Sequence, residues 1–99
     1  MYTILLTVLL EQSCGSWGNK AAELAMARAN GVPLSVARYY NNADIARARG
    51  KAGSTIQTAA DEAFAKSLLE EAYKSTEDPN KFGRAVYDKC MAATGGNKT

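Results

Sequence analysis

The amino-acid sequence predicts an all-α fold, a small bundle of about four helices. The chain of 99 residues is long enough for one modest core, and its 46% hydrophobic residues are mostly Ala, Leu and Val, with only 8% aromatic. Together with Lys, Glu and Arg, this composition favours helix. No segment after residue 18 alternates apolar and polar residues as a half-buried strand would. We therefore expect a single helical domain over residues 16–96 and a loose tail at 97–99.

The first 15 residues contain the most apolar stretch of the chain, over residues 2–10. This stretch is too short to cross a bilayer as a helix, so we predict no membrane span. It is either the core of a secretory leader that is cut after Gly15, or an extra helix of the domain. We prefer the leader, and with it an exported protein, periplasmic or secreted. A cytoplasmic protein that keeps this segment stays open.

Two helices are predicted on either side of an Asn-Gly turn, over about 20–30 and 33–49. Asn19 is a suitable N-cap for the first helix. Gly31 is suited to follow its end, because glycine adopts a positive φ without strain. Pro33 fits the first turn of the second helix, where its missing N–H is not needed.

The second of these helices has an apolar stripe that is expected to face the core, with one of two tyrosines packed in it: Val36, Tyr39 or Tyr40, Ala43 and Ala46. Two adjacent asparagines follow the tyrosines, and Asn42 is able to cap a separate short helix. The helix is therefore expected either to run on to about Arg49 or to break at the asparagines.

A third helix is predicted over about 55–75. Ser54 and Gln57 have the spacing of a capping box, which places the first helical residue at Thr55. Apolar residues recur at helical spacing and predict the buried face: Ile56, Ala60, Ala63, Phe64, Leu68 and Ala72.

A fourth helix is predicted over about 79–93, because Asp78 is a good N-cap and Pro79 a good first helical residue. The pair Gly95-Gly96 is expected to end it. The residues expected to face inward are Phe82, Val86, Cys90 and Ala93.

The charges are unevenly distributed along the chain, although the net charge is only +2. Residues 20–53 carry a net charge of +4, residues 54–80 carry −4 and residues 81–99 carry +3. Either oppositely charged helices lie side by side in one bundle, or the basic residues form a surface for an anionic partner. The candidates for such a surface are Arg28, Arg38, Arg47, Arg49 and Lys51.

The chain contains no histidine, which removes the commonest general base and metal ligand. Adjacent acidic residues such as Glu70 and Glu71 project about 100° apart on a helix and do not converge on one atom. We therefore predict no enzyme activity, no catalytic residue, no metal site and no cofactor. Cys14 and Cys90 form a disulfide if residue 14 is kept in an oxidising compartment. If the leader is removed, Cys90 is a small core residue.

Residues 23–42 have the pattern of two helices joined at an Asn-Gly turn. Residues 27–32 read Ala-Arg-Ala-Asn-Gly-Val, residues 35–38 read Ser-Val-Ala-Arg, and an Asn stands at position 41. This segment resembles the helix-turn-helix of lactose-repressor-type regulators, and the resemblance implies a DNA-binding second helix. One residue is missing between the two halves, and Pro33 stands where the family has a Ser or similar cap. A shift of one residue rotates a helix by about 100°, so an ordinary helical corner is the competing interpretation.

Three functions compete on these observations. The first is a small binding or inhibitor module that contacts another protein, whose identity the sequence does not give. Its candidate contact residues are Trp17, Tyr39 and Tyr40, because aromatic residues in or near loops often anchor interfaces. The second is a nucleic-acid-binding protein that uses the basic region 28–51. The third is an exported structural protein. We place protein binding first.

Overall fold

The computed structural model of the chain describes the backbone of residues 2–94 and the side chains of residues 13–93. Within this range it contains helices and no strand, so the predicted all-α class is confirmed. The predicted helix end at Gly95-Gly96 and the predicted tail at 97–99 lie outside the described residues. The four helices are α1 (Tyr2–Ala29), α2 (Leu34–Ala48), α3 (Ala59–Lys74) and α4 (Pro79–Thr94).

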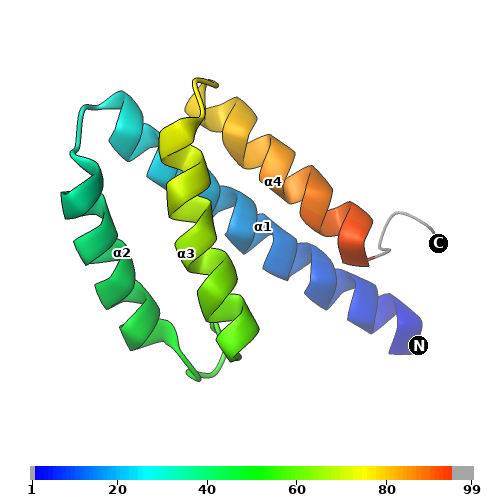
Figure 1. Cartoon of the computed structure of the whole chain (residues 1–99). Coiled ribbons are helices and arrows are strands. Elements are labelled where there is room, and N and C mark those ends of the chain that lie inside the picture. Colours follow the sequence, from blue (N-terminus) through cyan, green and yellow to red (C-terminus); the bar gives the residue numbers. More distant parts are fainter. Residues whose placement is uncertain (1, 95–99) are drawn as a thin grey trace.

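Helix α1 is the element against which α3 and α4 both pack (Figure 1). It joins the apolar stretch at 2–10 and the first predicted helix into one continuous helix of 28 residues. Helix α4 runs alongside α1 in the opposite direction. Helix α3 crosses α1 beside α4. Helix α2 packs on the far side of α3. The boundary after residue 15 falls inside α1, and removal of the residues before it stays a prediction.

Helices α1 and α4 approach each other closely where two glycines meet. A Cβ atom on Gly83 would lie 2.7 Å from the carbonyl oxygen of Gly18 and 2.8 Å from Cβ of Ala22. Only hydrogen fits at this position, which is why the backbones are able to come so close. One helical turn before Gly18, Cys14 is joined to Cys90 by a disulfide, with the two Cα atoms 5.5 Å apart. The α1–α4 pair is thus both tightly packed and cross-linked.

The turn between α1 and α2 forms at the predicted glycine. Gly31 has a φ of +81°, and its N–H donates to the carbonyl of Arg28 over 3.0 Å. The N–H of Val32 donates to the carbonyl of Ala27, so these two carbonyls at the helix end are satisfied. Tyr73 on α3 also stabilises this turn, because its hydroxyl donates to the Val32 carbonyl over 2.7 Å. Burial raises the pKa of Tyr73, which keeps this donor protonated.

Helix α2 runs unbroken through the two asparagines, and it buries a different face from the predicted one. Its buried residues are Ala37, Asn41 and Ile45, so the predicted stripe is wrong and both tyrosines point outward. The small side chains at 37 and 41 allow α2 to lie against α3. Asn41 is 2% exposed, and its Nδ2 donates to the carbonyl of Ala65 over 3.3 Å. Its Oδ1 accepts no hydrogen bond from the described residues.

Helix α3 begins four residues later than predicted, because a different capping box forms. Thr58 is the N-cap, and its Oγ1 accepts from the Asp61 N–H while Asp61 accepts from the Thr58 N–H. Ser54 instead accepts from the N–H of Ile56 inside the loop. Ile56 is buried from that loop and not from the helix. The buried residues of the helix itself are Ala65, Leu68, Leu69 and Ala72. The predicted burial of Ala60, Ala63 and Phe64 is wrong, because all three are exposed.

Helix α4 begins as predicted. Pro79 is its first residue, and the carboxylate of Asp78 accepts from the N–H groups of Asn80 and Lys81. Phe82 is buried, while Val86 and Cys90 are partly buried and pack against the core.

The glycine crossing predicts opposite results for two otherwise similar substitutions. Gly83→Ala forces the α1 and α4 backbones apart, and overpacking of this kind costs about 1–3 kcal/mol of unfolding free energy. Gly15→Ala is the matched control, because nothing lies within 4 Å of a Cβ there. Since alanine is the better helix former, this control should stabilise the protein by about 0.5–1 kcal/mol. Urea unfolding of both variants measures the difference, and equal effects of the two would contradict the close crossing.

The capping box predicts a dependence of stability on pH. Backbone N–H groups, first that of Gln57 and then that of Thr58, hold the pKa of Asp61 below its ordinary value of 3.8. The ionised carboxylate therefore stabilises the fold above that value, and the contribution disappears as the pH falls through the lowered pKa. Asp61→Asn should cost up to about 1 kcal/mol at neutral pH and almost nothing near pH 2. Unfolding curves at both pH values test this, and a cost that is the same at each would contradict it.

Candidate functional site

The outward side of α2 carries an exposed apolar and aromatic surface, which we call the tyrosine face and define as Val36, Tyr39 and Tyr40. Tyr39 is 69% exposed, Tyr40 63% and Val36 41%. The two tyrosine rings contact each other edge to face, with centroids 5.3 Å apart. Neither hydroxyl has a hydrogen-bond partner among the described residues. Because α2 packs on α3 through its opposite side, no described element covers this face.

The third predicted contact residue, Trp17, does not belong to this surface. It lies on α1, is 8% exposed and packs edge to face on Phe64 with ring centroids 4.8 Å apart. The structure therefore places Trp17 in the core and leaves the two tyrosines as the exposed aromatic pair.

Arg28, the first of the predicted basic contacts, is directed at backbone carbonyls of the chain itself. Its guanidinium donates to the carbonyls of Ala72, Ser75 and Glu77 over 3.2, 2.5 and 2.5 Å. These carbonyls lie at the end of α3 and just beyond it, where partial negative charge accumulates. Arg28 thus fastens the end of α1 to the α3–α4 connection, and both of its terminal nitrogens donate to the chain itself.

The other three arginines that were predicted to contact an anionic partner form ion pairs within the chain. Two of these pairs join the basic α2 region to the acidic α3. Arg38 contacts the Glu70 carboxylate through two nitrogens at 3.0–3.2 Å, and Arg49 contacts Glu62 at 3.1 Å. Arg47 pairs with Asp44 on its own helix. Oppositely charged segments do lie side by side. Each such exposed pair adds at most about 1 kcal/mol, but together they occupy the basic groups.

Lys51 differs from the four arginines, because its side chain forms neither an ion pair nor a hydrogen bond with a described residue. Ser35 is also exposed, near the start of α2. A DNA-reading helix needs several free donors on one side. Ser35 lies at the start of α2 and Lys51 beyond its end, and the two arginines of α2, Arg38 and Arg47, already have acidic partners.

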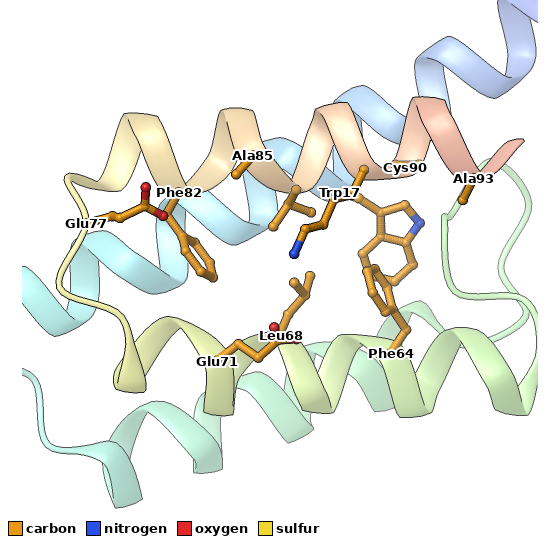
Figure 2. Close-up of a pocket in the computed structure, with 11 residues that line it drawn as sticks. Trp17, Phe64, Leu68, Glu71, Glu77, Phe82, Ala85, Cys90 and Ala93 are labelled. Atoms are coloured by element: carbon orange, nitrogen blue, oxygen red, sulfur yellow. The ribbon is translucent and has the colours of Figure 1, made fainter. Parts of the chain in front are cut away.

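A groove between α3 and α4 is the second candidate site, and the sequence did not indicate it. Its volume is about 410 Å³, and helix α1 forms its floor. Figure 2 shows Trp17 and Phe64 at one end of the groove and Phe82 with Glu77 at the other. Leu68 and Glu71 extend from α3 between them.

The groove exists because α3 and α4 both pack on α1 but hardly on each other. Phe64 therefore remains 41% exposed, although it is a large apolar residue. The sequence signal for it is weak: Phe64 lies beside the buried positions 65, 68, 69 and 72 and not among them. Phe64 lines a groove only because of the angle between α3 and α4.

In the part of the chain that the structure describes, no three His, Cys, Asp or Glu side chains come together to hold a metal ion. The two cysteines are joined to each other, and no described helix is long and apolar enough to cross a membrane. A cut after Gly15 would remove Cys14 and with it the disulfide, so the proposed leader and the cross-link exclude each other at that cut position.

The chain was compared with known protein families, with curated proteins and with solved structures, and none of them matches it. What the protein does must therefore be argued from the two surfaces described above.

Proposed function

We propose that this protein acts by binding another protein, without a reaction of its own, and that the tyrosine face is its contact surface. The observation that carries the proposal is the exposure of Tyr39 and Tyr40 side by side on helix α2. Tyrosine is among the residues most enriched at binding hot spots, because it offers a large ring and a polar hydroxyl. Burying two such rings gains apolar contact, and few rotamers have to be fixed.

The surroundings of the tyrosine face support a protein partner over a nucleic acid. Arg38 and Arg47, the nearest basic residues on α2, are both paired with carboxylates of the chain. A nucleic acid would have to break these pairs before it could use them for its phosphates. Nucleic-acid binding stays the alternative, supported by the exposed Lys51 and by the resemblance of residues 23–42.

The proposal predicts that the two tyrosines dominate the affinity for the partner. We expect a protein captured from the native host by the wild-type chain to bind the Tyr39→Ala/Tyr40→Ala variant at least about 30-fold more weakly, as expected when hot-spot residues are lost. Titration of the purified pair by calorimetry measures the two dissociation constants. The matched control is Lys81→Ala, an exposed change on α4 that should leave the affinity unchanged.

A partner that binds both forms equally would contradict the proposal. The same preparations should be titrated into labelled duplex and single-stranded DNA at low salt. A complex that forms there and weakens steeply as the salt concentration rises would favour the alternative instead.

A further inference from the structure

The groove between α3 and α4 lies on the other side of α3 from the tyrosine face, so protein binding at α2 leaves it unexplained (Figures 1 and 2). Its apolar lining is unusually aromatic for a chain with so few rings. It includes the chain's single tryptophan, Trp17, and both of its phenylalanines, Phe64 and Phe82. A concave, mostly apolar surface of this size is typical of sites for small molecules.

Three charged residues line the groove, and none of them forms an ion pair with a described residue: Glu71, Glu77 and Lys89. This distinguishes them from the acids on the α2 side of α3, Glu62 and Glu70, which both hold arginines. Arg28 contacts Glu77 through the backbone carbonyl and not through the carboxylate. The two carboxylates that line the groove are therefore free to accept a positive group from outside.

The free charges differ in sign along the groove. Glu77 lies next to Phe82 at one end, and Glu71 lies on α3 between that end and Leu68. Lys89 precedes Cys90, whose disulfide to Cys14 places this part of α4 near Trp17 at the other end. From Pro79 to Lys89 the helix rises by about 15 Å, so the Cα atom of Lys89 lies about three turns along α4 from the Glu77 end.

We propose that this groove binds an amphiphilic organic cation, a molecule with an apolar chain or ring system that ends in an ammonium group. The apolar part packs against Trp17, Phe64 and Leu68. The ammonium group lies at the other end, between Glu71 and Glu77 and next to the ring of Phe82. Aromatic faces and carboxylates together are the chemistry that attracts such a cation. Lys89 repels the ammonium group from the Trp17 end and so sets the orientation.

Trp17 makes the test direct, because the emission of the only tryptophan reports on occupancy of the groove. The full chain is titrated with decyltrimethylammonium at concentrations below those that form micelles and that alter the helical circular dichroism. Decanoate and decanol serve as the anionic and neutral probes with the same chain length. We expect a saturable change in Trp17 emission, with the cation bound most tightly of the three.

The carboxylates are tested with Glu71→Gln/Glu77→Gln, which should weaken binding of the cation about fivefold or more and leave decanol unaffected. Both residues are exposed and unpaired, so this variant should fold as the wild type does. The matched control is Glu23→Gln, an exposed acid on α1 that does not line the groove. Tyr39→Ala/Tyr40→Ala should bind the cation like the wild type, which separates this proposal from the one on protein binding.

Several results would overturn the proposal. These are the absence of a saturable change in Trp17 emission, equal or tighter binding of decanoate or decanol, and an unchanged affinity for the cation in the folded Glu71→Gln/Glu77→Gln variant. Tighter binding of decanoate would assign the charged end to Lys89 and reverse the orientation argued above.

Discussion

The close contact between α1 and α4 is the interaction on which the rest of the structure depends. Gly18 and Gly83 allow the two backbones to meet, and the disulfide between Cys14 and Cys90 ties the same pair one turn away. Once α4 is held along one side of α1, α3 packs against another side of it. The space that remains between α3 and α4 is the groove, and Trp17 extends from α1 into one end of it.

Most of the charged residues between α2 and α3 pair with each other. Helix α3 presents acids on two sides, and those that face α2 are neutralised by Arg38 and Arg49. Arg28 is used at the end of α3. Most of the basic residues that suggest a nucleic-acid partner in the sequence thus already have partners within the chain. What α2 offers to the outside is its tyrosines, and what α3 offers on its other side is a free carboxylate beside an aromatic groove.

The fold class could be predicted, and so could those helix ends that local chemistry determines. The predicted start at residue 20 is wrong, because α1 begins earlier and its expected N-cap, Asn19, lies inside the helix. Gly31 and the pair Asp78-Pro79 act within one helical turn, and the structure uses them as expected. The faces of α2 and α3 could not be predicted in the same way. Alanine is compatible with either side of a helix. The buried side of α2 includes the polar Asn41, so a search for apolar residues at helical spacing does not find it. Thr58 displaces Ser54 as the cap because Asp61 supplies the reciprocal bond, while Ile56 is held in the core from a loop.

The two candidate sites also differ in whether the sequence could predict them. The sequence names Tyr39 and Tyr40, and the structure exposes both, although one of them was expected to pack. The groove, by contrast, depends on the angle between two helices that are joined only through α1, and no short motif encodes such an angle. Residues that line it, such as Phe64 and Glu71, therefore look like ordinary core and surface positions until the helices are placed.

The most direct test of this account is the stability that the cross-link adds to the α1–α4 pair. Denaturant unfolding is compared between the oxidised full chain and its Cys14→Ala/Cys90→Ala variant. Because the disulfide closes a long loop, the account predicts that the variant loses about 2–4 kcal/mol of unfolding free energy while it keeps its helical circular dichroism. Two titratable thiols in the unreduced chain, or equal unfolding free energies for the two proteins, would contradict it.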